Sequence, residues 1–346
     1  MNKKVITVGI TLLLGVSLLS AYNPPFNGES LFNFATPALL SGVSSVTGGA
    51  FETDVQQDFS YNPSLIAGQQ RFTLNAAYTA LIQPGAAFNY GQTAQLGSLI
   101  ATKYGVIGLN LQGIFATFED MNWGNSGTLR VAYAKDLTDD LYVGTSLHST
   151  VGKYDWGLNL DIGFWYRIKK LKWLPFMKDI RWAFALTGMG KPYSTSGLGI
   201  NGKESESFPG MFTPRVGLAG TFLAVKNFSF GAAFDFAFPS FQNLEFAPSL
   251  QFLFGKIVLL NAGWKFNLRE TLCTKKVAMP TIGISVKFGI NTDGVNFMSN
   301  HGWEKTDIVT SAAYGYLQNG IHAASLGLSA FLGQKDTVAP EIKINF

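Results

Sequence analysis

The sequence predicts an all-β protein: a transmembrane β-barrel of about fourteen antiparallel strands with an N-terminal hatch (plug) inside its lumen. Three observations lead to this prediction. The chain begins with an export signal. Its composition is apolar and weakly charged, yet no later segment could form a membrane helix. Most of the chain alternates between apolar and polar residues with a period of two.

The first 21 residues predict a secretory signal peptide. Lys3 and Lys4 form a positive start, residues 5–19 are apolar, and Ser20 and Ala21 provide small residues at a cleavage site. The apolar run is short for a spanning helix, and an uncleaved N-terminal anchor is the alternative. No cysteine follows Ala21, so a lipid-modified N-terminus is not expected. We therefore expect an exported chain that begins near residue 22.

The composition excludes several classes of protein. Charged residues make up 14% of the chain, where about 25% is usual for a globular domain, and there are 29 Phe and 38 Gly. A formal net charge of +4 gives no reason to expect a nucleic-acid partner. The single cysteine, Cys273, excludes an intrachain disulfide and a cysteine-based metal site. Because only helices and closed barrels satisfy every backbone group in lipid, a bacterial outer-membrane barrel is the expected class.

The strands are predicted from segments such as "WGLNLDIGFWYRI" (156–168), "FSFGAAFDFAF" (228–238) and "VLLNAGWKFNL" (258–268). In each, large apolar residues occupy one face, and small or polar residues occupy the other. A soluble sandwich would also alternate, but with a charged polar face and shorter strands. The predicted strands are 70–82, 94–103, 104–118, 126–136, 140–152, 154–168, 180–190, 213–225, 226–239, 243–254, 256–268, 277–290, 307–317 and 320–332, with 337–346 as a possible fifteenth. Residues 135–140 and 224–227 are predicted turns, and residues 190–214 a long outer loop.

Residues 22–69 do not alternate, so they cannot lie in the bilayer as strands. They could hang in the periplasm or fill the barrel. A tethered hatch is favoured because several apolar residues in this segment, among them Phe34, Leu39 and Leu40, need burial, and a fourteen-strand lumen has room for them. The expected organisation is a signal peptide (1–21), a hatch (22–69) and a barrel (70–346).

The stretch from Gly48 to Tyr78, "GGAFETDVQQDFSYNPSLIAGQQRFTLNAAY", resembles the hatch and first strand of the FadL-type outer-membrane transporters of long-chain fatty acids and other hydrophobic compounds. The matching positions are Gly49 and Ala50, then Asn62 and Pro63, while Ser64 replaces the family's usual Ala. The resemblance implies a plugged fourteen-strand barrel. It also implies passive uptake of hydrophobic molecules through an internal apolar pocket and a lateral opening in the wall. It does not identify the ligand.

Candidate ligand-binding residues follow from strand parity and from the hatch. Arg130 and Arg215 are predicted to face the lumen, where either could meet a ligand carboxylate; the alternative is a mutually satisfied network with the inward-facing acids Asp161, Asp235 and Glu245. The hatch aromatics Phe51, Phe59 and Tyr61 could line an apolar groove, or they could simply pack against the wall. No cofactor, metal site or catalytic group is expected, although His148 beside Ser149 leaves an outer-membrane hydrolase as a separate hypothesis.

Gly113 is the candidate for the lateral opening, because a glycine within a strand often marks a bend or bulge; a neutral gap on the lipid-facing side is the alternative. The terminal Phe346 fits the aromatic C-terminal signature that the barrel assembly machinery reads. The expected partners are thus the lipid bilayer, that machinery and a hydrophobic ligand such as a long-chain fatty acid, with the chain as a monomer. The competing function is a non-transporting barrel that acts as a scaffold, a secretion partner or a surface adhesin.

Overall fold

The computed structural model describes most of the chain, and the fold below concerns these residues alone. They are 23–24, 33–43, 45–51, 58–85, 89–118, 121–170, 177–194, 203–204, 212–277, 279–291, 303, 305–317 and 320–333. None of the helices in these ranges is long and apolar enough to span a membrane. The predicted signal peptide, the possible fifteenth strand and Phe346 lie outside the described residues.

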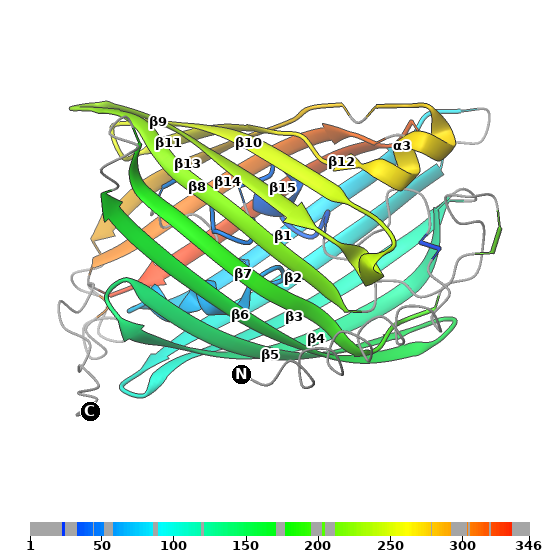
Figure 1. Ribbon diagram of the computed structural model, residues 1–346, viewed down its shortest axis with the longest axis horizontal. Coiled ribbons are helices and arrows are strands. Elements are labelled where there is room, and N and C mark those ends of the chain that lie inside the picture. The colour runs from blue at the N-terminus through cyan, green and yellow to red at the C-terminus, as the bar shows by residue number, and fades with distance from the viewer. Residues whose placement is uncertain are drawn as a thin grey trace, which may run out of the picture.

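One antiparallel sheet makes up nearly all of the described chain (Figure 1). Its first eight strands are β1 (Phe72–Gln83), β2 (Asn89–Thr102), β3 (Gly105–Phe118), β4 (Met121–Thr138), β5 (Leu141–Gly152), β6 (Trp156–Lys170), β7 (Lys178–Lys191) and β8 (Thr213–Val225). The remaining strands are β9 (Phe228–Ala237), β10 (Glu245–Phe254), β11 (Val258–Gly263), β12 (Phe266–Asn267), β13 (Thr281–Asn291), β14 (Lys305–Tyr316) and β15 (His322–Leu332).

The sheet closes on itself. Each strand pairs with the next in sequence, and β1 pairs with β15, so that Phe72 lies opposite Leu332. β10 pairs with both β11 and β12, which therefore occupy one strand position. The result is a closed barrel of fourteen strands, as the alternation predicted. Closure leaves no unpaired sheet edge along most of the wall, which is the condition for placing strands in lipid.

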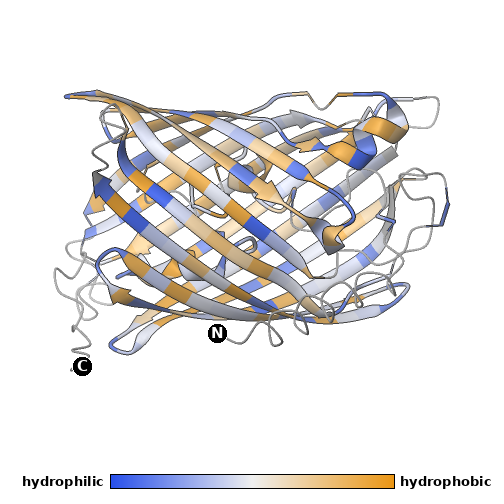
Figure 2. Cartoon of the chain, in the orientation of Figure 1, coloured by the Kyte–Doolittle hydropathy of each residue, from blue (hydrophilic) through white to orange (hydrophobic). Residues whose placement is uncertain are grey.

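The alternation of side chains confirms the predicted inside and outside faces (Figure 2). On β2, Leu96 keeps 60% of its surface exposed while its neighbour Gln95 keeps 2%. On β6, Trp156, Leu158, Leu160 and Ile162 are all exposed, and Asp161 is fully buried. A soluble protein would not leave such a belt of large apolar side chains exposed. The outer face is therefore suited to lipid, and polar residues line the interior.

The described residues 33–43, 45–51 and 58–69 are called here the N-terminal segment, and they contact the inner face of the wall on both sides. The helix α2 (Pro37–Leu40) contacts β13, β14 and β15, and the 3-10 helix η1 (Pro63–Gly68) contacts β3, β4, β5 and β6. Both are buried. In Figure 1 these elements appear in dark blue among the strands.

Four predicted strands and one predicted turn differ clearly in their bounds. β2 begins at Asn89 rather than at residue 94, and β4 begins at Met121 rather than at residue 126. The segment 256–268 is not continuous, because pairing is interrupted at Trp264 and Lys265 and the helix α3 (Leu268–Thr274) begins directly after β12. The strand predicted from residue 277 begins at Thr281, after Pro280, whose missing N–H cannot extend a ladder. β4 runs on to Thr138, so the turn before β5 is shorter than 135–140.

The two ends of the barrel differ in their connections. β1 begins and β15 ends at one end, while α3 and the long connection from Lys191 to Thr213 lie at the other. Bacterial barrels have short turns on the periplasmic side and longer loops outside. We therefore assign the end that carries α3 as the outer end.

Candidate functional site

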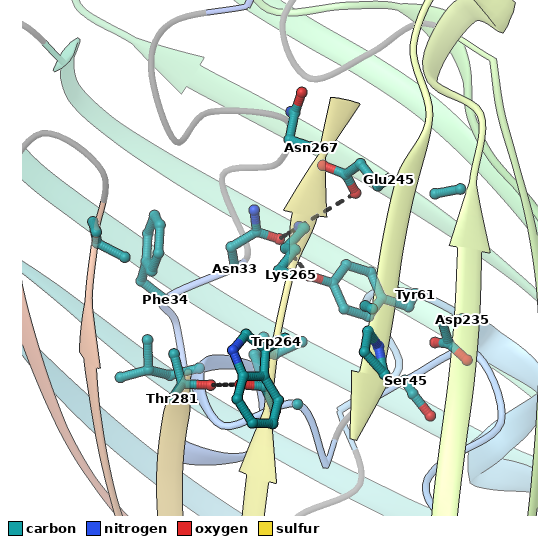
Figure 3. A pocket seen from close by; sticks show the side chains of 18 of the residues that line it. Asn33, Phe34, Ser45, Tyr61, Asp235, Glu245, Trp264, Lys265, Asn267 and Thr281 are labelled. Atoms are coloured by element: carbon teal, nitrogen blue, oxygen red, sulfur yellow. Dashed lines mark hydrogen bonds and ion pairs between the residues drawn. The ribbon is translucent and has the colours of Figure 1, made fainter. Parts of the chain in front are cut away.

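An interior cavity of about 120 Å³ lies between the N-terminal segment and the wall formed by β8 to β14 (Figure 3). It is near the outer end, below α3. The side chains that line it come from segments far apart in the sequence, so only the closed barrel brings them together. They include Asn33, Phe34, Leu39, Leu40, Ser45, Tyr61, Arg215, Asp235, Glu245, Trp264, Lys265, Asn267, Glu270, Met279, Thr281, Tyr316 and Leu317.

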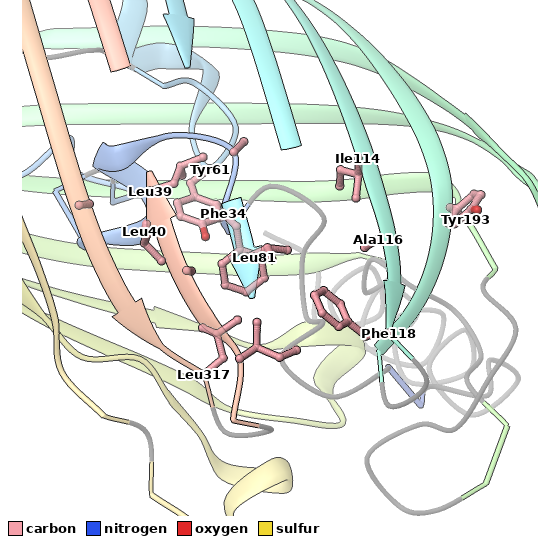
Figure 4. Packing of buried hydrophobic residues seen from close by; sticks show 14 residues of the cluster. Phe34, Leu39, Leu40, Tyr61, Leu81, Ile114, Ala116, Phe118, Tyr193 and Leu317 are labelled. Atoms are coloured by element: carbon pink, nitrogen blue, oxygen red, sulfur yellow. The ribbon is translucent and has the colours of Figure 1, made fainter. Parts of the chain in front are cut away.

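The apolar side of the cavity is built largely by the N-terminal segment. Thr36 caps α2 by accepting a hydrogen bond from the backbone N–H of Leu39 (3.2 Å), and Pro37 begins the helix. The wall holds this turn in place, because the Thr79 hydroxyl donates to the carbonyl of Phe34 (2.6 Å). Phe34, Leu39 and Leu40 belong to a buried cluster that also contains Leu81 and Leu317 (Figure 4).

The polar side centres on Glu245, which keeps 2% of its surface exposed. Its carboxylate lies 3.3 Å from the Lys265 ammonium and 3.9 Å from the Arg215 guanidinium. The Lys265 Nζ also donates to Asn33 Oδ1 (2.8 Å), so a wall cation is linked to the N-terminal segment. A buried charge is costly unless it is paired, and this arrangement pairs each of the three.

Tyr61 connects these groups. Its hydroxyl donates to Asn33 Oδ1, and the guanidinium of Arg215 lies over its ring, 4.5 Å from the centroid. Burial raises the pKa of the Tyr61 phenol, and the neighbouring cations Lys265 and Arg215 reduce this effect without cancelling it. The phenol therefore stays neutral and remains a donor over the ordinary pH range.

The charges around the cavity do not leave cations in excess. Arg215 and Lys265 are accompanied by three carboxyl side chains, Asp235, Glu245 and Glu270. Asp235 accepts a hydrogen bond from the backbone N–H of Val46 in the N-terminal segment (2.5 Å). A ligand carboxylate would thus have to compete with Glu245 for Arg215 or Lys265. Within the described ranges, no group of three His, Cys, Asp or Glu side chains is arranged to hold a metal ion.

Arg130 faces the lumen as predicted, but it lies in a different polar cluster beneath β4, β5 and β6. Asp161 is the centre of that cluster: it lies 3.9 Å from Arg130 and 3.1 Å from His148, and it accepts hydrogen bonds from the Ser146 hydroxyl (2.8 Å) and the Gly188 N–H (2.8 Å). Arg130 is 2% exposed and does not line the cavity. Asp161 therefore lies within ion-pair distance of both Arg130 and His148 in this cluster.

Phe51 and Phe59 lie away from the cavity. Phe51 belongs to a buried cluster with Val43 and the wall residue Leu259. Phe59 belongs to another, with Leu99 and Val106. Of the three candidate aromatics, the structure therefore brings only Tyr61 together with Arg215. A ligand role for Phe51, Phe59 or Arg130 stays a prediction.

The predicted hatch motif makes close backbone contacts with the wall. The Ala50 N–H donates to Gln251 Oε1 (2.9 Å), and Arg181 donates to the carbonyl of Gly49 (3.1 Å). Gly49 has φ +87°, a conformation that favours glycine. Asn62 caps η1 by accepting from the Ser64 N–H (3.0 Å) and donates to the Val46 carbonyl (2.8 Å). Asn62 and Pro63 therefore fix η1 against the wall.

Gly113 lies on the outer face, in a shallow depression between Leu111 and Phe115. Its neighbours at the same level are Ala94 on β2 and Gly127 on β4, and the pairing on both sides continues through Gly113 without a shift. The first irregularity in this part of the wall lies further along, between Ala116 and Phe118. The lateral opening at Gly113 stays a prediction, and the structure shows an intact ladder at this position.

Several cavity residues were not singled out in the sequence. Trp264 was assigned to the outer face by parity, and Glu245 only to the lumen. Asn33, Glu270 and Met279 carry no sequence signal that would place them at one site. The alternation along a strand shows only whether a side chain faces inward or outward. It does not show how far along the barrel axis the side chain lies, or at which angle around the barrel.

No protein-family model matches the sequence, and no curated protein matches it. Solved structures do match. The CymD monoaromatic hydrocarbon channel has a TM-score of 0.50 and 9% identity, covering 89% of this chain and 100% of that one. The ΔS2S3 mutant of the TodX monoaromatic hydrocarbon channel has a TM-score of 0.51 and 10% identity, covering 89% of this chain and 99% of that one.

At such low identities the likeness shows the fold alone. This chain has the fold of outer-membrane β-barrel channels, and its closed barrel with an apolar outer face lies in a bacterial outer membrane. Membership of the FadL-type family, expected from residues 48–78, stays a prediction.

Proposed function

We propose that this protein is a passive outer-membrane channel for small hydrophobic molecules, with the N-terminal segment acting as a hatch. The observation that carries the proposal is the cavity between that segment and the wall. Apolar side chains from the N-terminal segment meet a few converging polar groups there, which is the usual composition of a small-molecule site. Two solved structures with the same fold are monoaromatic hydrocarbon channels, which supports this class of ligand.

As a hatch, the N-terminal segment would close the lumen, and transport would require it to move. A ligand shifts such an equilibrium only if it binds one arrangement better than the other. The cavity offers a way to do so, since Phe34, Leu40 and Tyr61 of the segment line it together with wall residues. A ligand in the cavity would contact both parts at once. We infer that occupancy loosens the contact between Asn33 and Lys265.

The size and charge of the cavity favour a compact, neutral ligand. A dry cavity of roughly 150 Å³ is enough for benzene, so about 120 Å³ corresponds to a molecule of about one ring. The carboxyl groups of Asp235, Glu245 and Glu270 oppose an anion. A long-chain fatty acid is the second candidate, expected from the FadL resemblance. It would need the segment to move and its carboxylate to displace Glu245 from Arg215 or Lys265.

Uptake measurements test both candidates. The chain is expressed in a host that lacks its own hydrocarbon and fatty-acid channels, and the entry of radiolabelled toluene and oleate is compared with that of cells without the chain. We expect faster entry of toluene. Lipids that co-purify with the protein in detergent are identified by mass spectrometry in parallel. Uptake of oleate with bound fatty acid would support the second candidate.

A non-transporting scaffold, secretion partner or adhesin gives a different result. Such a barrel would be correctly assembled in the outer membrane and yet leave the entry of both compounds unchanged. A matched variant, Glu245→Gln, separates the two ligands. It removes the negative charge beside Arg215 and Lys265, so it is expected to raise oleate uptake relative to toluene uptake.

A further inference from the structure

The outer rim carries exposed cations but no exposed acid where α3 joins β12 to β13. Glu245 and Glu270 are the only carboxyl side chains there, and both line the cavity and are buried. Lys275 and Lys276 are exposed, and Arg269 is partly exposed. The outer surface of this part of the rim is therefore positively charged. The described stretches considered are 238–247, 262–277, 279–284 and 312–317.

Large apolar side chains lie beside these cations. Leu268 and Leu272 are four residues apart on α3, so they share one face of the helix, and Leu272 keeps 70% of its surface exposed. Glu270 lies between them in sequence and is buried on the opposite side. Exposed apolar surface continues along the chain after α3. We call this amphipathic surface the rim patch; it consists of Leu268, Arg269, Leu272, Lys275, Lys276, Val277 and Met279.

The rim patch lies at the level of the headgroup layer. Ile282, the second residue of β13, pairs with Tyr314 near the outer end of β14. Tyr314 and Tyr316 are both exposed, and such tyrosines concentrate where a barrel meets the headgroup region. The rim patch precedes β13 in the chain and lies on the outer side of these tyrosines, with α3 at the rim of the barrel (Figure 1). Charged headgroups and the upper ends of acyl chains meet at this level.

The backbone holds the rim patch in one orientation. Asn267 caps α3 by accepting a hydrogen bond from the Glu270 N–H (2.9 Å). At the other end of the helix, the N–H of Lys275 donates to the carbonyl of Thr271 (2.8 Å), and Lys275 adopts φ +57°, which ends α3. The apolar face and the lysines are therefore presented together without further ordering of the chain, which reduces the entropic cost of binding a partner.

We propose that the rim patch binds the phosphorylated glycolipid that forms the outer leaflet of a bacterial outer membrane. The ammonium groups of Lys275 and Lys276 and the guanidinium of Arg269 pair with its phosphate groups. Leu268 and Leu272 contact its acyl chains, as the apolar face of an interfacial helix does. This binding site is separate from the interior cavity, and it does not depend on whether the barrel transports a ligand.

Retention of the glycolipid by the purified protein tests the proposal. The natural chain and the double variant Lys275→Gln with Lys276→Gln are purified from outer membranes in a mild detergent. The number of phosphorylated glycolipids per barrel is measured by native mass spectrometry, and heat-dependent gel mobility checks that both chains are folded. Two lost cations should reduce retention by about tenfold or more. Equal retention by two folded chains would overturn the proposal.

Lys226 and Lys256 provide the matched control. Both are exposed beside the exposed apolar residues Val225 and Ile257, but they lie in turns at the opposite end of the barrel, before β9 and after β10. Glutamine at both positions removes the same charge from an end that the outer leaflet does not contact, so retention should equal that of the natural chain. An equal loss in the two double variants would make total charge the cause and would refute a site at the rim patch.

Purified lipids distinguish the parts of the ligand. The natural chain, stripped of lipid, is titrated in detergent with diphosphorylated lipid A, with the same lipid after removal of its phosphates, and with phosphatidylglycerol. The first should bind most tightly, and salt should weaken its binding. Leu272→Ser should weaken it without changing the salt dependence, because no charge is lost. Equally tight binding of phosphatidylglycerol would overturn the assignment to the glycolipid, and equally tight binding of the dephosphorylated lipid would overturn the role of the lysines.

Discussion

Tyr61 is the residue at which the N-terminal segment and the wall meet most directly. Its hydroxyl donates to Asn33 within the segment, while its ring lies under the guanidinium of Arg215 from β8. Lys265 reaches the same Asn33 from between β11 and β12. A small polar group of four side chains therefore joins three parts of the chain, and a change in any one of them affects the others.

The Tyr61 phenol should resist ionisation. Burial raises its pKa above the ordinary value of about 10. Because the folded-state pKa exceeds the unfolded one, the stability linked to the neutral phenol is fully present below the unfolded pKa. It is lost as the pH rises through the folded one. The measurement is the tyrosinate difference absorbance of the natural chain minus Tyr61→Phe. Ionisation of Tyr61 together with exposed tyrosines would contradict this assignment.

For single residues, the sequence correctly predicted which side chains face the lumen, but it did not predict which of them lie next to one another. The inward orientation of Arg130, Arg215, Asp161 and Glu245 followed from parity, because a strand has only two faces. Parity could not tell that Arg130 lies with Asp161 beneath β5 while Arg215 lies with Glu245 beside the cavity. That distinction depends on the register between strands, which is set by pairing and not by a single strand's sequence.

At the scale of elements, η1 fits the wall because glycines on β5 and β6 leave room for it. A Cβ at Gly144 would lie 2.7 Å from the backbone of Pro63, and one at Gly163 would overlap Asn62 Oδ1 and lie 2.8 Å from the Pro63 ring. These glycines let the backbone of η1 approach the sheet directly. The "NPS" sequence of the segment and the inner glycines of two strands are thus complementary parts of one contact.

Gly163→Ala should separate η1 from β6. The added methyl cannot coexist with Asn62 in its present position, so the cap on η1 is lost, at a cost of about 1–3 kcal/mol. The unfolding midpoint, followed by the heat-dependent gel mobility of the barrel, is the measurement. Gly289→Ala is the control: it is inward-facing by parity, and a methyl there would be 3.7 Å from Asp307. Partial rescue by Asn62→Gly would confirm the contact, and equal effects of both alanine variants would refute it.

The strands were predictable as elements because an apolar outer face and a small or polar inner face must alternate along every one of them. The interruption at Trp264 was not, since "NAGWKFNL" keeps its alternation throughout. It is caused by the partner strand, where Pro280 ends β13 at Thr281 and leaves residues 264–267 without a neighbour on that side. A proline next to the neighbouring strand therefore determines the structure of a segment whose own sequence predicts a strand.

At the scale of the whole molecule, the N-terminal segment is held by two opposite regions of the wall. α2 contacts β13 to β15, and η1 contacts β3 to β6. Between them, the segment donates to Asp235 and Gln251 and accepts from Arg181. The wall itself closes by strand pairing alone, since β1 pairs with β15 over eleven residue positions from Phe72 to Ile82. The barrel wall is therefore expected to assemble without the N-terminal segment.

Deletion of residues 22–61 tests this separation. The barrel should still assemble, because its ladder does not include the deleted residues, but it should conduct small hydrophilic solutes that the full chain excludes. Swelling of proteoliposomes in arabinose is the measurement, with folded barrel quantified by gel mobility as the control. An assembled barrel with unchanged permeability would show that the segment does not close the lumen, as expected for a periplasmic tail.

The inner glycines also constrain how this protein can change over time. The backbone of the N-terminal segment occupies space that wall side chains would otherwise fill. The inner surface of the wall is therefore complementary in shape to this particular N-terminal sequence. A related chain with a larger residue in place of Gly163 is expected to carry a shorter one in place of Asn62. The N-terminus and strands a hundred residues away should therefore be inherited as a pair, and a chimaera that joins the segment of one lineage to the barrel of another should fail at these positions first.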